Sequence, residues 1–319
     1  MYDLIIIGGG PAGLTAAAYA IRRRLETLLI SEDLGGKANY RMQLAGTEGH
    51  EVITGDEVLD KFKGQLRYLD YAHRIDRVTR VAAAGRRFLV QTDSGATFEG
   101  KAIIVATGAM PRALGVPGED RLLGRGVSYS AISHAHLFMG KDVAVVGSGQ
   151  LALRAASGLV QAARKVYLVA PQGNLLESRL GRDLHQAANV DALQGWRVIA
   201  VWGREYVESI VVEATSGEQR ELPVAAVFVE LGLEPQSALV ASLVEVNEAG
   251  QIVVDKRGRT SRPGIFAAGD VTDSFSEQAL IAIGEGAKAA LSTFEYLLER
   301  GGRMDWSEAA RQMIGEGWG

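Results

Sequence analysis

The 319-residue chain contains no cysteine, and this absence excludes several kinds of chemistry. Without cysteine the chain forms no disulfide, no thiolate zinc site and no cysteine-ligated iron–sulfur cluster. A redox-active dithiol is excluded as well, because only a pair of thiols cycles with a disulfide. The cysteine count therefore constrains the mechanism, although it says nothing about the redox compartment.

The chain also lacks a strong charge bias and long apolar runs. Its formal net charge of -4 leaves no basic footprint, which argues against nucleic acid as a partner. No apolar run approaches the ~18 residues that would cross a bilayer, and we expect no signal peptide, because no charged segment precedes the first apolar run. With 47% hydrophobic and 23% charged residues, we expect a soluble, cytoplasmic protein of two domains.

A dinucleotide-binding motif follows the first apolar segment. Residues 4–7 (LIII) predict a strand buried on both faces, and an alanine-rich helix is predicted after the glycines. Gly8 allows the tight turn, Gly10 lets the backbone approach a pyrophosphate, and Gly13 lets helix and strand pack closely. Pro11 and Ala12 stand between Gly10 and Gly13. A second strand, residues 27–30, leads to Glu32, placed where an acid accepts from a ribose hydroxyl.

The motif recurs in the middle of the chain. Residues 142–146 (DVAVV) predict a strand, and Gly147, Gly149 and Gln150 follow in a second glycine loop. Ala152 replaces the third glycine, a permitted variant. The strand predicted at residues 165–169 ends at Ala170-Pro171, which offers neither a carboxylate for a 2′-hydroxyl nor a basic cluster for a 2′-phosphate. Two interpretations stay open: a pyridine nucleotide site without a clear preference between NADH and NADPH, or a vestigial or differently occupied site.

Two further segments connect the first unit with FAD. Residues 102–108 predict a strand ending in the small-residue turn Thr107-Gly108, where backbone passes close to a cofactor. Residues 264–270 predict another strand, ending in Gly269-Asp270. A helix is expected from about Glu277 to Tyr296, with Gln278 and Ala279 at its start. Its apolar face, which includes Ala282 and Ala290, is interpreted as core.

Over about residues 1–300 the chain resembles the low-molecular-weight thioredoxin reductases, and still more the flavoprotein component of alkyl hydroperoxide reductase. The resemblance rests on both glycine loops and on motifs that are specific to that fold, namely GG at 35–36, ATG at 106–108, VPGED at 116–120, VELGLEP at 229–235, GIFAAGD at 264–270 and GEGAKA at 284–289. It implies an α/β fold of two Rossmann-like dinucleotide-binding domains, the second inserted into the first. The expected FAD domain comprises residues 1–111 and 241–300, the NAD(P)-binding-like domain 112–240, and a tail 301–319.

The resemblance also implies cofactor contacts and a quaternary structure. Asp270 and Gln278 correspond to FAD contacts, and Gly36 belongs to the matching glycine pair. Lys37 stands where the family commonly has a flavin-facing glutamine, which changes the electrostatics at that point. Members of the family form homodimers, so we expect one here.

The main departure from the family lies at residues 128–134 (SYSAISH). The family has two cysteines and an aspartate there, whereas this chain has Ser130, Ser133 and His134. Serine cannot cycle to a disulfide, so the relay from flavin to dithiol is lost. No catalytic residue is assigned, although His134 is a candidate proton donor. His134 and His136 have poor spacing for a metal and no carboxylate cluster beside them, so no metal site is predicted.

Two functions from different classes follow. The first is an FAD oxidoreductase that passes electrons between NAD(P)H, or a small electron-transfer protein, and a non-thiol acceptor such as ferredoxin, flavodoxin, a quinone or oxygen. The second is a flavin-binding protein without steady turnover, with a sensing or assembly role. In the tail we expect a short amphipathic helix. Two interpretations stay open: a helix packed on the body or a frayed terminus, or a segment in which Trp306 or Trp318 covers the flavin or the second nucleotide site.

Overall fold

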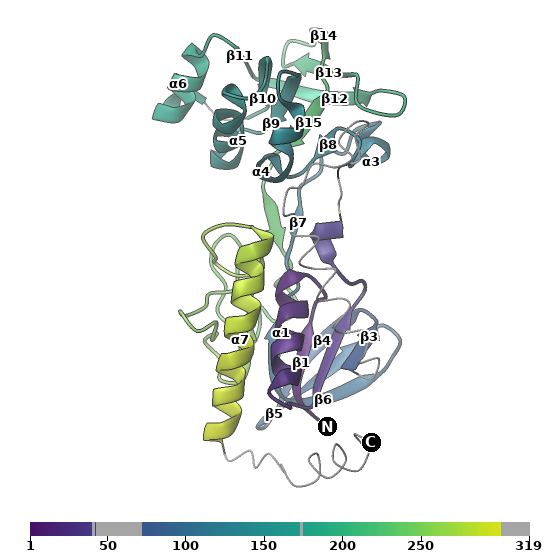
Figure 1. The fold of residues 1–319 in the computed structure, drawn as a ribbon, viewed down its shortest axis with the longest axis vertical. Coiled ribbons are helices and arrows are strands. Elements are labelled where there is room, and N and C mark those ends of the chain that lie inside the picture. The colour runs from purple at the N-terminus through teal and green to yellow at the C-terminus, as the bar shows by residue number, and fades with distance from the viewer. Residues whose placement is uncertain (40–41, 43–71, 173–174, 301–319) are drawn as a thin grey trace, which may run out of the picture. The chain divides into compact units, whose positions relative to one another are not determined.

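The structure, a computed structural model, describes residues 1–39, 42, 72–172 and 175–300, and within these it divides into two compact units (Figure 1). The first unit comprises the described residues of 1–38, 72–108 and 235–300, and the second those of 39–42 and 109–234. The predicted tail lies outside the described residues.

The first unit is built on a seven-stranded mixed sheet. Its strand order is β3-β2-β1-β6-β5-β4, and β17 also pairs with β6. Pairing is parallel from β3 to β6 and between β6 and β17, whereas β6-β5 and β5-β4 are antiparallel. The strands are β1 (Tyr2–Ile7), β2 (Thr27–Ser31), β3 (His73–Ile75), β4 (Val78–Ala84), β5 (Arg87–Thr92), β6 (Thr97–Val105) and β17 (Ile265–Ala267).

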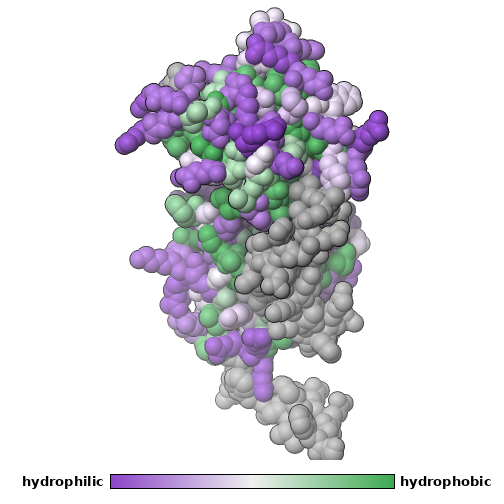
Figure 2. All heavy atoms as spheres, turned by 45° about the horizontal axis from the view of Figure 1, so that its top comes forward, coloured by the Kyte–Doolittle hydropathy of each residue, from purple (hydrophilic) through white to green (hydrophobic). Residues whose placement is uncertain are grey.

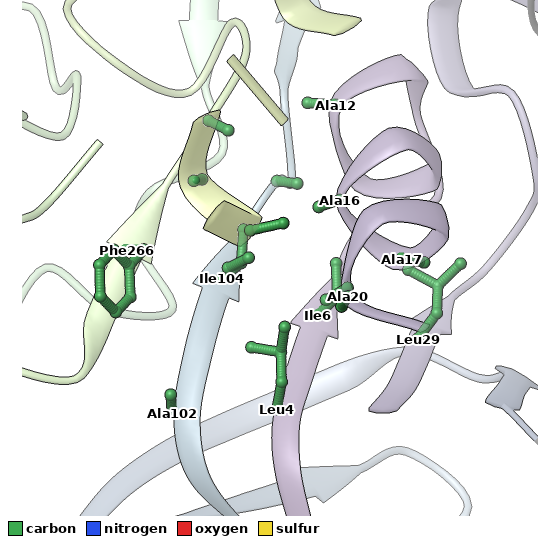
Figure 3. Close-up of a cluster of buried hydrophobic side chains, with 14 of the residues drawn as sticks. Leu4, Ile6, Ala12, Ala16, Ala17, Ala20, Leu29, Ala102, Ile104 and Phe266 are labelled. Atoms are coloured by element: carbon green, nitrogen blue, oxygen red, sulfur yellow. The ribbon is translucent and has the colours of Figure 1, made fainter. Parts of the chain in front are cut away.

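Small side chains pack two helices against this sheet. Helix α1 (Pro11–Arg22) packs Ala12, Ala16, Ala17 and Ala20 into a buried cluster with apolar residues of β1, β2 and β6, as Figure 3 shows. Helix α7 (Ala279–Glu299) packs against α1 so closely that a Cβ on Gly286 would lie 2.1 Å from the Ala12 carbonyl oxygen. This separation is far below van der Waals contact, so only glycine fits there.

The expected bounds of three of these elements differ from the observed ones. Helix α7 begins at Ala279 rather than at about Glu277, because Gln278 has an extended backbone (φ -123°, ψ 138°). Strand β6 ends at Val105, before the small-residue turn, and β17 spans only Ile265–Ala267. The interpretation of the α7 apolar face as core is confirmed for Ala282 and Ala290, which are both buried in the cluster that α1 also joins.

The second unit repeats the parallel arrangement. Its five-stranded sheet has the order β11-β10-β9-β15-β8 and is parallel throughout. The strands are β8 (Val127–Ser128), β9 (Asp142–Val146), β10 (Lys165–Ala170), β11 (Val190–Gln194) and β15 (Ala226–Val229). The helices of this unit are α3 (Glu119–Leu122), α4 (Ala131–His134), α5 (Gln150–Val160) and α6 (Arg179–Gln186), and its 3-10 turns are η3 (Ala135–Phe138) and η4 (Leu175–Glu177). A further 3-10 turn, η1 (Gly36–Asn39), belongs to the first unit except for its last residue.

A three-stranded antiparallel meander completes the second unit and contacts its sheet through β12 and β10. It consists of β12 (Trp196–Trp202), β13 (Ser209–Ala214) and β14 (Gln219–Pro223). Two short paired strands, β7 (Ala109–Pro111) and β16 (Leu233–Pro235), mark where the chain enters and leaves this unit. The predicted α/β fold, with one Rossmann-like unit inserted into another, is therefore confirmed.

The visible surface mixes hydrophilic and hydrophobic side chains, with hydrophilic ones projecting outermost (Figure 2). No helix within the described residues is both long and apolar enough to cross a bilayer.

Candidate functional site

The first glycine loop connects β1 to α1 and has the backbone geometry of a phosphate cradle. Gly8 adopts φ +109°, and a Cβ there would lie 2.2 Å from the Ala106 carbonyl oxygen. A Cβ on Gly13 would lie 1.9 Å from the Gly8 carbonyl oxygen, so helix and strand are in close contact. At Gly10, by contrast, a Cβ would meet nothing within 4 Å. The loop is thus in close backbone contact at Gly8 and Gly13 and open at Gly10, the position that would face a pyrophosphate.

The start of α1 suits the same ligand. Gly10 is the N-cap residue, Pro11 is the first helical residue, and no side chain caps the helix. The amide groups of a helix N-terminus, together with the helix dipole, favour an anion. Ala12 is buried and lies close to Gly269, which follows β17, since a Cβ on Gly269 would lie 3.0 Å from the Ala12 methyl group. These residues fit the diphosphate of a dinucleotide such as FAD.

Lys37 and Asp270 bring two distant segments together beside this loop. The Lys37 Nζ atom lies 2.6 Å from Asp270 Oδ2, with both side chains mostly buried. Gly36, the neighbour of Lys37, is close to Gly10, because a Cβ on Gly36 would lie 3.3 Å from the Gly10 Cα. The ion pair therefore places a cation and a carboxylate next to the segment that would hold the diphosphate.

Glu285 of α7 fixes the loop that carries Asp270. Its carboxylate accepts hydrogen bonds from the Gly269 amide at 2.8 Å and from the Ser274 hydroxyl at 2.7 Å. Sequence reasoning missed this residue, although it belongs to the GEGAKA motif. The motif alone could have drawn attention to it, because it is the one acid in that segment.

The remaining residues predicted for the first unit lie at the ends of its strands. Glu32 directly follows β2 and is exposed. Thr107 follows β6 and donates to the Gln236 carbonyl at 2.7 Å, while the next residue, Gly108, has φ +72°. Gln278 and Ala279 form the N-cap and first turn of α7. The structure thus places the predicted FAD residues at the carboxyl edge of the parallel strands and at two helix N-termini.

The second glycine loop repeats this geometry in the second unit. Gly147 follows β9 with φ +152°, and a Cβ there would lie 2.4 Å from the Glu230 carbonyl oxygen. Gly149 is the N-cap of α5, and a Cβ there would meet nothing within 4 Å. Gln150 begins the helix, and the Ser148 hydroxyl accepts a hydrogen bond from the Gln172 amide at 3.1 Å. This loop also fits a diphosphate.

Serine hydroxyl groups occupy residues 128–134, the segment for which the sequence predicts no dithiol. The Ser130 Oγ atom donates to Ser133 Oγ at 2.9 Å, and Ser130 caps the short helix α4. The amide of Ala131, between them in sequence, donates to Glu230 at 2.9 Å. Two hydroxyls at hydrogen-bond distance cannot exchange electrons as two thiols do.

His134 is half-buried and contacts a third serine. Its Nδ1 atom lies 2.8 Å from Ser128 Oγ. Burial lowers the pKa of the His134 imidazole to about 4, and repulsion from His136 acts in the same direction. The ring is therefore neutral near pH 7. Within the described residues, no three His, Asp or Glu side chains are grouped closely enough to hold a metal ion.

Two glycine loops, each at the carboxyl end of a parallel strand and the start of a helix, are typical of oxidoreductases with two Rossmann-like domains. The chain belongs to the pyridine nucleotide-disulphide oxidoreductase family, whose sequence profile matches residues 2–286. It is 36% identical over 303 residues to the alkyl hydroperoxide reductase F protein of Staphylococcus aureus, and the alignment covers 93% of this chain and 59% of that protein. The Staphylococcus epidermidis protein of the same name is 35% identical with the same coverage. The chain thus spans about three-fifths of the length of these curated relatives.

Solved structures show the same likeness. Thioredoxin reductase from Streptococcus pyogenes superposes with a TM-score of 0.84 at 34% identity, covering 94% of this chain and 99% of that one. Thioredoxin reductase from Giardia duodenalis gives a TM-score of 0.82 at 29% identity, covering 93% and 99%. The expected resemblance to thioredoxin reductase and alkyl hydroperoxide reductase is confirmed.

Proposed function

We propose that the protein is an FAD-dependent oxidoreductase that moves electrons between NAD(P)H, or an electron-transfer protein, and a non-thiol acceptor such as ferredoxin, flavodoxin, a quinone or oxygen. When bound, FAD supplies the group that accepts a hydride and passes electrons on. The residues of this chain bind that group and determine which acceptors it reaches.

The proposed FAD residues act together at the edge of the first sheet. The start of α1 and the open position at Gly10 receive the diphosphate. Glu32, after β2, accepts from a ribose hydroxyl. Asp270 is held in place from two sides, by Lys37 at 2.6 Å and by the Glu285 hydrogen bond to the adjacent Gly269 amide. Such support from neighbouring groups fixes the orientation of a binding side chain.

The observation that carries the proposal is the pair of hydroxyls at Ser130 and Ser133, 2.9 Å apart. In a dithiol mechanism two electrons reduce a disulfide in this segment, and thiol exchange passes them to a partner. This chain has no cysteine, so it cannot hold those electrons in sulfur. The chain therefore supplies no sulfur relay between a bound flavin and its acceptor.

The partner and the cellular context belong to the same proposal. We propose a homodimer in the cytoplasm that works with a small electron-transfer protein or a small-molecule acceptor, without nucleic acid or a membrane span. The relatives named alkyl hydroperoxide reductase F extend beyond the region matched here.

Anaerobic reduction of the purified protein tests the proposal. NADH or NADPH should bleach the flavin absorbance, and ferricyanide or a quinone should reoxidise it over many turnovers. Reduction by reduced ferredoxin alone would identify the electron-transfer protein as the donor. A flavin that stays oxidised with every donor would contradict the proposal and favour a flavin-binding protein without turnover.

A further inference from the structure

A hollow of about 530 Å³ lies in the second unit, at the carboxyl ends of its central strands. Val146 ends β9, Pro171 follows β10 and Leu231 follows β15, and all three line it. Residues 114–117 and the meander strands β12 and β13 form its other walls. Ligands of parallel α/β sheets bind outside the carboxyl ends of the strands, and the volume is within the usual range for small-molecule sites.

Two charged side chains line this mostly apolar hollow. Arg197 of β12 and Glu213 of β13 are cross-strand neighbours, and the Arg197 Nε atom donates to Glu213 Oε2 at 3.1 Å. Gln219 donates to the other carboxylate oxygen at 3.0 Å. Hydrogen bonds from Gln219 and Arg197 lower the pKa of the Glu213 carboxyl, so it is ionised at neutral pH.

The same edge of the sheet carries the second glycine loop. Val146 lines the hollow and immediately precedes Gly147, and Ser148 is hydrogen-bonded to Gln172, next to Pro171. In Rossmann units the acid that accepts from the adenosine ribose stands at the end of the second strand. Here that strand is β10, which ends at Ala170 and is followed by Pro171. The local chain supplies no carboxylate there, whereas Glu213 supplies one from across the hollow.

We propose that this hollow receives the adenosine half of a pyridine dinucleotide and that the Arg197–Glu213 pair selects for the group at the ribose 2′ position. The proposal rests on the proposed function and adds the residues that determine nucleotide specificity. The Glu213 carboxylate accepts a hydrogen bond from a 2′-hydroxyl and repels a 2′-phosphate. Arg197 offsets part of that repulsion, because its guanidinium donates to phosphate. The pair as a whole favours NADH over NADPH moderately.

Removing the Glu213 charge should shift the specificity toward NADP⁺, and removing the Arg197 charge should shift it toward NAD⁺. The test measures NAD⁺ and NADP⁺ binding to the oxidised holoprotein by isothermal titration calorimetry. Glu213→Gln should weaken NAD⁺ binding about tenfold, the effect of losing a charged hydrogen bond, and strengthen NADP⁺ binding. Arg197→Gln should weaken NADP⁺ binding further and leave NAD⁺ binding nearly unchanged.

A matched control lies in the first unit. Arg87 of β5 and Glu99 of β6 form an ion pair between two adjacent strands, at 2.8 Å, so Glu99→Gln should leave both affinities unchanged. If both nucleotides bind and their affinity ratio is the same in wild type and both variants, the specificity assignment is wrong while the proposed function stands. If neither nucleotide binds to the wild type, the assignment fails together with the NAD(P)H part of the proposed function.

Discussion

The ammonium group of Lys37 and the carboxylate of Asp270 lie 2.6 Å apart, although 233 positions (270 - 37) separate them in the sequence. The pair connects the turn after β2 with the loop after β17, and both segments border the first glycine loop. Lys37 offsets the charge of the Asp270 carboxylate, so that this carboxylate repels an anionic ligand of the loop less strongly.

Replacing Lys37 tests that role. Lys37→Met should weaken FAD binding to the apoprotein about tenfold, because a charge-assisted interaction is lost and the Asp270 carboxylate is left unpaired, and should make binding less sensitive to salt. Fluorescence quenching of FAD at two salt concentrations measures both effects. Lys101→Met is the control, since Lys101 and Asp3 form another pair at 2.6 Å in the same unit, away from the glycine loop. Equal losses of affinity in both variants would contradict a specific role for Lys37.

Two glycines of the first loop should respond differently to substitution. Gly10→Val should fold normally but lose FAD, because its side chain enters space that no protein atom fills within 4 Å of the Cβ position. Gly13→Ala should instead destabilise the fold, since its Cβ would lie 1.9 Å from a carbonyl oxygen. Circular dichroism and the absorbance of bound flavin distinguish the two outcomes. A yellow Gly10→Val protein would show that the diphosphate lies elsewhere.

The serine pair predicts a missing activity. The wild-type protein should not reduce thioredoxin with NADPH at enzymatic rates, that is, with kcat of order 1 per second or more, because Ser130 and Ser133 form no disulfide. The double variant Ser130→Cys, Ser133→Cys need not gain the activity, since His134 also differs from the family pattern. Thioredoxin-dependent NADPH oxidation measures both proteins, and turnover by the wild type would disprove the direct transfer of electrons.

His134 should make the stability of the protein depend on pH. Its pKa is about 4 in the folded protein and about 6.5 when unfolded. The unfolded chain therefore binds the proton first as pH falls, and stability decreases below about pH 6.5. From pH 7 to 5 we expect a loss of about 1–2 kcal/mol from this group. His134→Gln should remove that part of the slope in thermal melts, whereas His136→Gln should keep most of it. Equal slopes in wild type and His134→Gln would contradict the assignment.

The sequence predicted the two Rossmann-like units because their signals are local. An apolar strand, a glycine loop and a helix follow one another at each site, and the glycines are needed for close backbone contacts that the structure contains. The signal for β17 was also local, although it did not show that this strand pairs with β6.

The charged pairs could not be predicted from the sequence. Lys37 and Asp270 meet only because η1 and the loop after β17 approach the same glycine loop, and Arg197 and Glu213 meet only through the register of β12 with β13. Register depends on which face of each strand is buried, and a single sequence does not state it. The sequence indicates His134 as a candidate proton donor, but the imidazole is neutral because of burial that only the fold reveals.

The close contact between Gly286 and Ala12 has a consequence for how the protein is made. During synthesis residues 109–234 leave the ribosome as one continuous stretch and complete the second unit, while the first unit still lacks β17 and α7. Domains generally fold as units as they emerge, so the inserted unit is expected to fold before the first unit, whose sequence it interrupts. Nascent chains ending before Ala279 would then contain a folded second unit and an open first glycine loop, and flavin would be captured only after translation of α7.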